Sequence, residues 1–344
     1  MAREKNPYLR QFDQTVWDEK VLKENKDLTK DFINYCKSVD RSVKTIIQYE
    51  FNLKGLFCYI YKEFNNKSFV KLTKRDIMNM QSYWLNEAKL SSSRIRFIKS
   101  TMSSLSNFIE NILDDEYEGF RNIINKIPAP IQTKVMEKTI MNEEDISILL
   151  NKLVEKGYIQ HAFYVAILYS SGMRKAESLR LKLDWFNDSN IIYGCLWKTP
   201  TTILTKGRGK GKPLIKYFFI PKLKPYLELW LAERERLGVN IPDMFVVKKE
   251  GVWKPASEVT IDSWIRTIKK VYGDRYYSHL NRHALCSELL RNGIPAEVVK
   301  DLFGWESVEM VQCYSDNDKE DSFKDFFSES GIDIKERKGL TDIK

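Results

Sequence analysis

A short proline-containing segment divides this chain, and it limits the possible folds more than any other feature of the sequence. Residues 126–134 read Lys-Ile-Pro-Ala-Pro-Ile-Gln-Thr-Lys and show no apolar period. Because Pro128 and Pro130 lack an amide donor and clash with a preceding helical turn, no helix can cross this segment. The 344 residues are enough for two domains that each bury a core. We therefore expect a linker over residues 127–138 with one domain on each side.

The part of the chain before the linker shows helical periods only. Residues 1–20 have no clear period and are predicted to form an N-terminal arm. Beyond them, apolar residues recur at helical spacing, and serines or threonines stand where helices need an N-cap. The predicted helices cover residues 27–39, a long segment after Ser42, one after Thr73, one after Ser91 and a short one after Gly119. We expect residues 21–126 to form an all-helical domain.

Helical and β-like patterns alternate after the linker. The segment Asn142-Glu-Glu-Asp145 can open a helix, and residues 161–172 are almost all apolar, which predicts a buried helix. Residues 190–221 are β-like, and the glycines and lysines of 207–213 predict a hairpin turn. The expected fold class is therefore mainly α (α+β). Residues 139–314 would form a mostly helical domain with a small antiparallel sheet.

The chain is basic, which favours a polyanionic partner. It carries 56 Lys and Arg against 47 Asp and Glu, a formal net charge of +9. The excess lies in both predicted domains, whereas residues 315–344 are acidic and contain Phe323, Phe326 and Phe327. We expect both domains to contact nucleic acid and the tail to contact protein. The alternative is that the surface lysines only keep the protein soluble.

Membrane, metal and disulfide chemistry find little support in the sequence. No apolar run could cross a membrane, and residues 1–25 are too charged for a signal peptide, so a cytoplasmic protein is expected. The five cysteines include no Cys-x-x-Cys pair, which argues against zinc and disulfides. His279 and His283 stand four apart, but Arg282 lies between them and no carboxylate does. We expect no metal site and no cofactor.

Four clusters suited to phosphate chemistry follow one another along the chain. The first, Ser171-Gly-Met-Arg174, comes directly after the predicted buried helix. Gly172 permits a tight turn that presents Arg174 at the surface of the core, and Glu177 lies close enough to orient it. The simpler alternative is an ordinary ion pair at the start of a helix.

The second cluster is the tip of the predicted hairpin. It carries Lys206, Arg208, Lys210 and Lys212, separated by glycines that let the loop approach a backbone closely. Four positive charges suit nucleic-acid phosphates. The loop lacks the Gly-Lys-Ser/Thr ending of a nucleotide-binding loop, which argues against ATP. The alternative is a solvated turn.

The third and fourth clusters lie near the end of the second domain. His279 and Arg282 stand three apart at the start of a helix, so they point the same way and can hold one phosphate. His283 points elsewhere and is expected to be a packed, structural histidine. The fourth cluster is Phe303-Gly-Trp305, followed nine residues later by Tyr314. A lone tyrosine is ordinarily core or surface, so only its position singles it out.

These four clusters, in this order, resemble the tyrosine recombinase (phage integrase) family, which includes lambda integrase, Cre and the Xer-like site-specific recombinases. The resemblance covers essentially the whole chain beyond the first twenty residues or so. The family box Gly-x-Arg-x-x-Glu matches Gly172, Arg174 and Glu177, and the box His-x-x-Arg-His matches His279, Arg282 and His283. The box Leu-Gly-His/Trp matches Phe303, Gly304 and Trp305, and the tyrosine that follows it matches Tyr314. Trp305 departs from the histidine of most members but agrees with the Cre-like branch.

The resemblance implies a mechanism without metal or ATP. The implied catalytic residues are Arg174, Lys206, His279, Arg282, Trp305 and Tyr314, with Glu177 and His283 in support. Tyr314 would attack a DNA phosphodiester, and two arginines would neutralise the developing charge. His279 and Trp305 would donate hydrogen bonds to the phosphate, and His279 would also help accept the tyrosine proton. Lys206 would protonate the leaving 5′-oxygen, with Lys210 and Lys212 as alternatives in the same loop.

The resemblance also implies an organisation on DNA. Residues 21–126 would be a helical core-binding (SAM-like) domain, residues 139–314 the catalytic domain, and 315–344 a tail that docks on a neighbouring protomer in a nucleoid-associated tetramer. Docking of the tail on its own domain is the alternative. Paired recombination sites on double-stranded DNA would be the partner.

Basic residues of the helical domain would close the other half of a clamp around DNA. Arg96 and Lys99 stand three apart beside the apolar stripe of their helix, as a phosphate-facing edge should. A solvated face is the alternative. The predicted DNA-binding residues are Lys71, Lys74, Arg75, Arg94, Arg96 and Lys99 in this domain and Arg208, Lys210 and Lys212 in the hairpin.

The function that these expectations imply is site-specific DNA recombination of the integrase or transposase type. Two alternatives share parts of the pattern. A type IB topoisomerase uses the same chemistry without paired sites, and a catalytically silent relative would only bind DNA as a regulator.

Overall fold

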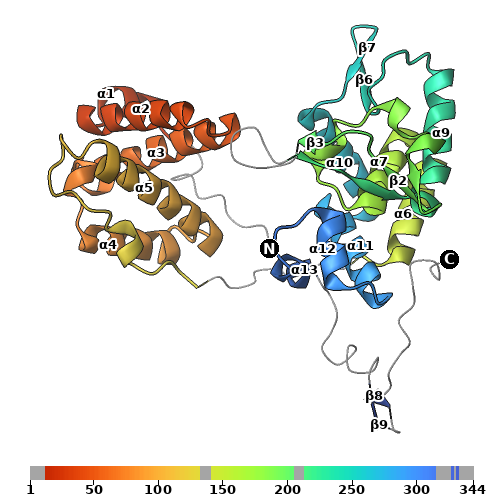
Figure 1. The fold of residues 1–344 in the computed structure, drawn as a ribbon. Helices are drawn as coiled ribbons and strands as arrows, with labels where there is room; N and C mark the ends of the chain where they lie inside the picture. The colour runs from red at the N-terminus through yellow and green to blue at the C-terminus, as the bar shows by residue number, and fades with distance from the viewer. Residues whose placement is uncertain (1–11, 132–140, 205–212, 315–326, 329–330, 333–344) are drawn as a thin grey trace. The chain divides into compact units, whose positions relative to one another are not determined.

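The computed structural model describes residues 12–131, 141–204, 213–314, 327–328 and 331–332. The chain divides into two compact units (Figure 1), the first containing the described residues up to 131 and the second those from 141 to 314. Each unit has its own buried apolar cluster. Among the described residues, no helix combines the length and apolar composition that a membrane span requires.

Unit 1 is all-helical in its described part. Its α-helices are α1 (Gln14–Glu19), α2 (Lys23–Ser38), α3 (Val43–Glu63), α4 (Lys74–Asn86) and α5 (Ser92–Ile112), and its short 3₁₀ turns are Phe69–Lys71 and Ile124–Lys126. Helix α3 packs against α1, α2 and α5. Its core is rich in aromatic rings, such as Phe57 at the centre of α3 and Trp84 on α4, which are both fully buried.

Three helix starts that the sequence predicts in unit 1 are confirmed, whereas α2 begins at Lys23, four residues before the predicted start at Asp27. The Ser42 hydroxyl accepts a hydrogen bond from the Thr45 amide at 3.2 Å, and Ser91 does the same for Arg94 at 3.2 Å. Thr73 forms a capping box at the start of α4. These side chains satisfy amide groups that the first helical turn leaves without partners.

Two further predictions for unit 1 differ from the structure. Residues 14–19, which lie within the predicted N-terminal arm, form α1, which buries Trp17 against the core. A six-residue helix is too short to display a period, so its sequence carries no visible signal. The short helix expected after Gly119 is a 3₁₀ turn, Ile124–Lys126, because only one turn fits before the prolines.

Unit 2 is mostly helical with small antiparallel sheets, which confirms the predicted fold class. Its helices are α6 (Glu143–Glu155), α7 (Ile159–Ser171), α8 (Lys175–Ser178), α9 (Ile220–Arg236), α10 (Glu258–Tyr272), α11 (His279–Arg291), α12 (Ala296–Phe303) and α13 (Glu309–Tyr314). Its strands are β1 (Ile191–Ile192), β2 (Leu196–Lys198), β3 (Ile203–Leu204), β4 (Pro213–Leu214), β5 (Tyr217–Phe219), β6 (Val246–Lys249) and β7 (Val252–Pro255). Two short strands follow in the tail, β8 (Phe327–Ser328) and β9 (Gly331–Ile332).

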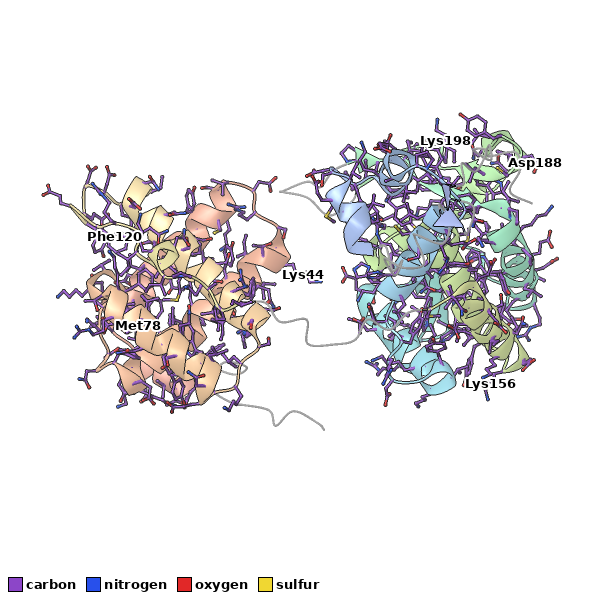
Figure 2. The ribbon with its side chains drawn as sticks, turned by 90° about the horizontal axis from the view of Figure 1, so that it is seen from below. Lys44, Met78, Phe120, Lys156, Asp188 and Lys198 are labelled. Atoms are coloured by element: carbon purple, nitrogen blue, oxygen red, sulfur yellow. The ribbon has the colours of Figure 1, made fainter. Side chains whose placement is uncertain are left out.

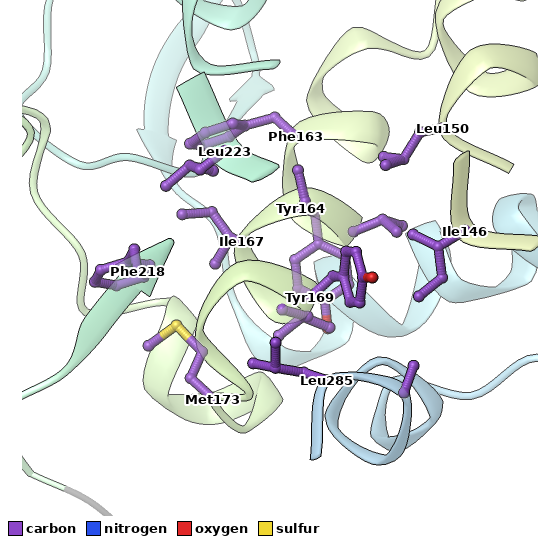
Figure 3. Packing of buried hydrophobic residues seen from close by; sticks show 14 of the residues in the cluster. Ile146, Leu150, Phe163, Tyr164, Ile167, Tyr169, Met173, Phe218, Leu223 and Leu285 are labelled. Carbon is purple, nitrogen blue, oxygen red and sulfur yellow. The ribbon is translucent and has the colours of Figure 1, made fainter. Parts of the chain in front are cut away.

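Helix α7 runs through the centre of unit 2. It is surrounded by α6, α9, α11 and strand β5, and every residue from 162 to 171 is buried. In Figure 3, Phe163, Ile167 and Met173 face Leu223 and Phe218 on one side, while Tyr164 and Tyr169 lie toward α6 and α11. A helix with neighbours on all sides needs apolar residues all round, which explains its uninterrupted apolar sequence.

The predicted β region forms two small sheets. Strands β1, β2 and β5 make an antiparallel sheet in that order, with Trp197 opposite Phe218, while β3 pairs with β4. The β-like segment at 214–220 is divided between two sheets, because the chain leaves the β3–β4 ladder before it enters β5. Figure 2 shows the side chains filling both units, with Lys44, Lys156 and Lys198 among the exposed charges.

Candidate active site

Arg174 stands where α7 gives way to α8. Helix α7 ends at Ser171, and Gly172 takes a left-handed conformation with φ +58° that turns the chain. The Arg174 amide donates to Glu177 Oε2 at 2.9 Å, and its guanidinium Nη1 donates to Glu177 Oε1 at 2.9 Å. The arginine side chain is 30% exposed. Glu177 thus orients Arg174 and leaves part of it accessible, the geometry expected from the sequence.

A buried lysine, which the sequence analysis did not select, completes this pair. Lys216 Nζ lies 3.1 Å from Glu177 Oε2, and the two side chains are 1% and 2% exposed. Burial raises the pKa of Glu177, but the charge of Lys216 and hydrogen bonds from Arg174 and Lys216 outweigh it, so the pKa falls below its usual range. The available signal was a lone charge inside the apolar run from Leu214 to Ile220.

Arg282 joins three of the four sequence clusters. It lies on α11, is only 1% exposed, and its Nη1 donates a hydrogen bond to the carbonyl of Gly172. Its guanidinium carbon lies 4.8 Å from the Phe303 ring centroid and 4.7 Å from that of Trp305. Such cation–π stacking fixes the plane of a guanidinium. The fold therefore brings the Arg174 turn, the start of α11 and the end of α12 together.

The two histidines of α11 differ in their exposure to solvent. His279 is the first residue of the helix and is exposed, whereas His283 is half-buried. Neighbouring side chains fix this helix start, since Asn281 Nδ2 donates to the Tyr276 hydroxyl at 3.0 Å. The Ser278 hydroxyl also lies 3.1 Å from that of Tyr164 on α7.

Trp305, two residues beyond the end of α12, is a buried side chain. It is 5% exposed, its indole nitrogen is buried, and its ring stacks on Phe303 with centroids 4.6 Å apart. The ring face of Trp305 supports Arg282, and the hydrogen bond from its indole N–H to a phosphate stays a prediction. Gly304 has a φ of +66° and lies against Leu214. The sharp turn at this glycine directs the Trp305 indole into the core.

Tyr314 is the final residue of α13, the last helix in the described part of unit 2. Helix α13 packs against α11 and α12, so the backbone at Tyr314 belongs to the same group of elements as Arg282. The side chain of Tyr314 is not described. Lys206, Arg208, Lys210 and Lys212 all lie outside the described residues. Among the residues that are described, no group of His, Cys, Asp and Glu could hold a metal ion.

The predicted DNA-binding residues of unit 1 fall into two groups. Lys71, Lys74, Arg75 and Arg96 are exposed, and Arg94 is half-buried with its guanidinium 5.8 Å from the Phe97 ring. Lys99 is buried, 5% exposed, and donates to the Ile127 carbonyl at 2.6 Å and to Gln81 Oε1 at 2.8 Å.

Burial, together with the charge of Arg96, lowers the pKa of Lys99. The expectation that Lys99 faces a phosphate is wrong, because its ammonium group holds the beginning of the linker instead. Arg96 takes part in the same anchoring, since its Nε donates to the Pro130 carbonyl at 3.1 Å.

Comparisons with known proteins agree with this geometry. The model of the phage integrase family matches residues 139–321. An SPbeta prophage-derived recombinase-like protein, YomM, of Bacillus subtilis is 29% identical over 294 residues, covering 84% of this chain and 85% of that protein. A tyrosine recombinase of Thermosipho africanus is 25% identical over 312 residues, covering 85% of this chain and 97% of that protein.

Solved structures share the fold. XerH recombinase bound to a palindromic difH substrate superimposes with a TM-score of 0.63 at 18% identity, covering 92% of this chain and 89% of that one. The Tn1549 transposon integrase in complex with circular intermediate DNA gives 0.62 at 15% identity, covering 87% of this chain and 98% of that one.

Proposed function

The chain belongs to the phage integrase family, and we propose that it is a site-specific recombinase that cuts and rejoins DNA through a 3′-phosphotyrosyl bond to Tyr314. The observation that carries this proposal is the contact of Arg282 with the Gly172 carbonyl, two residues before Arg174. It ties two motifs that are 110 residues apart into one positively charged site. The DNA-bound state of the XerH and Tn1549 relatives supports double-stranded DNA as the partner.

The proposed reaction is an in-line displacement at phosphorus. The Tyr314 hydroxyl oxygen attacks, the tyrosyl O–P bond forms and the bond from phosphorus to the 5′-oxygen breaks. His279 accepts the phenolic proton, and Lys206 supplies a proton to the leaving 5′-oxygen. Because one phosphoester replaces another, rejoining by a 5′-hydroxyl needs no ATP.

Charge stabilisation is the main contribution of the fixed residues. The transition state gathers negative charge on the non-bridging oxygens, and preorganised cations lower its energy most when they need not move. Arg174 is held by Glu177 and Arg282 by two aromatic rings. The site therefore offers guanidinium groups whose geometry is set before DNA binds.

The larger organisation is part of the same proposal. Unit 1 would be the core-binding domain, with its exposed Lys71, Lys74 and Arg75 against the DNA backbone. The tail after Tyr314 would contact a neighbouring protomer in a tetramer. A 5′-hydroxyl from a second duplex then completes recombination, whereas the original one restores the starting strand, as in a topoisomerase.

A covalent trap tests the chemistry. On a nicked duplex that loses the short fragment carrying the 5′-hydroxyl after cleavage, the wild-type chain should accumulate a protein–DNA adduct, also in EDTA and without ATP. Tyr314→Phe should form none, because the variant lacks the attacking oxygen. Tyr193→Phe, at an 83% exposed tyrosine of the same unit, is the matched control and should behave like the wild type.

Two outcomes would contradict the proposal. Equal adduct from wild type and Tyr314→Phe would show that another residue attacks, and no adduct from either would favour a silent DNA-binding protein. On plasmids with paired target sites, strand exchange between sites supports recombination. Relaxation of supercoils on plasmids without such sites supports the topoisomerase alternative.

A further inference from the structure

A charged side chain in the core beside the site has no role in the chemistry described so far. Lys216 is 1% exposed, and its ammonium lies 3.1 Å from the carboxylate that holds Arg174. Burying an ion pair is costly, and apolar replacements of such pairs are often neutral or stabilising. Stability alone therefore gives weak reason for a lysine at this position.

The backbone fixes Lys216 firmly. Its carbonyl accepts a hydrogen bond from the Thr199 amide at 2.9 Å, and its own amide donates to the Thr199 hydroxyl at 3.1 Å. This pairing extends the β2–β5 ladder by one residue. Because β5 packs on α7, Lys216, directly before β5, lies beside the turn after α7 that carries Arg174.

The charges of the site explain what the lysine contributes. Arg174 and Glu177 alone sum to zero, so the carboxylate would compete with DNA for the arginine. A second cation on the far carboxylate oxygen offsets that negative charge, and Lys216 Nζ is bound to Oε2 while Arg174 Nη1 is bound to Oε1.

The charged groups of Lys216, Glu177, Arg174 and Arg282 also interact electrostatically. Burial lowers the pKa of Lys216, Glu177 opposes that shift, and the charges of Arg282 and Arg174 lower it further. The Lys216 ammonium therefore lies close enough to Arg174 and Arg282 to be repelled by both guanidinium charges.

We infer that Lys216 is a positioning residue for strand cleavage: by pairing with Glu177 it locks the carboxylate that orients Arg174 and leaves the arginine's positive charge available to the scissile phosphate. This inference rests on the proposed function. The Lys216 ammonium is engaged by Glu177 Oε2 at 3.1 Å, so this role differs from the proton transfer proposed for the hairpin lysine.

Replacement by methionine tests this role, because methionine keeps the length of the side chain and removes its charge. With Lys216→Met, we expect cleavage of the nicked duplex to slow about 100-fold, as a small misplacement of a catalytic group does. DNA affinity should change less than about threefold, since it is spread over many phosphate contacts. Rates are compared per folded molecule, with folding followed by circular dichroism.

A half-buried lysine of the same unit provides a matched control. Lys222 on α9 is 17% exposed and pairs with Glu288 at 2.7 Å and Glu143 at 2.9 Å, neither of which belongs to the proposed catalytic set. Lys222→Met should lower stability but leave the cleavage rate per folded molecule unchanged. If Lys216→Met behaves in the same way, its role is structural and the inference is wrong.

Two further arms separate positioning from proton transfer. Adding Glu177→Gln to Lys216→Met removes the competing carboxylate charge, so the double variant should recover at least about fivefold of the lost rate; no recovery contradicts the inference. The double variant also contains no unpaired buried carboxylate, so it can be measured if Lys216→Met alone folds poorly. A 5′-bridging sulfur is a leaving group that needs no proton, so selective rescue of Lys216→Met by this substrate would reveal a general acid instead.

The same experiment distinguishes a failure of the inference from a failure of the proposed function. Arg174→Ala and Tyr314→Phe are included on the same substrate. If neither lowers cleavage, the proposed function itself is wrong. If both do and Lys216→Met matches Lys222→Met, only the positioning role is wrong.

Discussion

At the scale of single residues, Gly172 is the point on which the site depends. Its carbonyl accepts the hydrogen bond of Arg282, and its φ of +58° turns the chain toward Arg174. A Cβ at this position would overlap the Phe303 ring, which in turn stacks under Arg282. One small residue thus allows both arginines to take their places.

Gly172→Ala should therefore be costly. We expect a loss of about 3 kcal/mol in the free energy of unfolding, combining left-handed strain with overpacking against Phe303. Gly194→Ala is the control, because Gly194 has a similar φ of +69° but open space around its Cα. It should lose only about 1 kcal/mol, the strain alone. Equal losses in urea unfolding would show that the Phe303 contact contributes nothing.

Residue types and order revealed part of the site from the sequence. Arg174 is the N-cap of α8 and Glu177 is its third residue, so their contact follows from local geometry. Lys216 could not be found this way, because only the pairing of β2 with β5 brings it beside Glu177. The indole of Trp305 is buried for a similar reason, since its surroundings come from Arg282 on another helix.

At the scale of elements, long apolar patterns were reliable and short ones were not. Helices α3, α5 and α7 each span three turns or more, so their apolar faces are visible in the sequence. Helix α1 has six residues and the strands have two to four, too few to show a period. Their conformation is set by packing on larger elements, as Trp17 illustrates in the core of unit 1.

A half-buried histidine gives the stability of unit 2 a measurable dependence on pH. His161 packs between the Tyr158 and Trp264 rings, both with centroids 5.3 Å away, and burial lowers its pKa to about 4. The unfolded chain binds a proton near pH 6.5 while the folded one does not. Stability is therefore full above that pH and is lost as the pH falls toward 4.

We expect this loss to be about 1–2 kcal/mol for a partly exposed group. His161→Gln should flatten the dependence between pH 6.5 and 4.5 in urea titrations that follow unit 2. The carboxylates titrate mainly below this window, and the lowered pKa of Glu177 places its contribution lower still. An unchanged slope in the variant would mean that His161 is protonated in the folded state.

At the scale of the whole molecule, the net charge of +9 is distributed in a way that the sequence could only partly predict. Exposed Lys74 and Arg75 agree with a surface for DNA, whereas Lys99 belongs to the anchor of the linker. Periodicity places a lysine beside an apolar stripe, but it cannot say that backbone carbonyls will cover it.

This difference predicts separate effects on DNA binding. Replacing Lys74 and Arg75 by alanine should reduce the slope of log affinity against log salt by about 1–2, because each phosphate contact releases about one counterion. Lys99→Met should leave that slope unchanged while lowering the stability of unit 1. A reduced slope for Lys99→Met would show that Lys99 contacts a DNA phosphate.

If Tyr314 is the nucleophile, it carries the covalent bond to DNA after cleavage, and the attachment site can be identified by mass spectrometry. After cleavage of the nicked duplex, nuclease and protease digestion leave one peptide bearing a nucleotide, which tandem mass spectrometry can sequence. We expect a nucleotide linked through its 3′-phosphate to the Tyr314 phenolic oxygen and to no other residue. A nucleotide on a different tyrosine or a serine, or one linked through its 5′-phosphate, would contradict it.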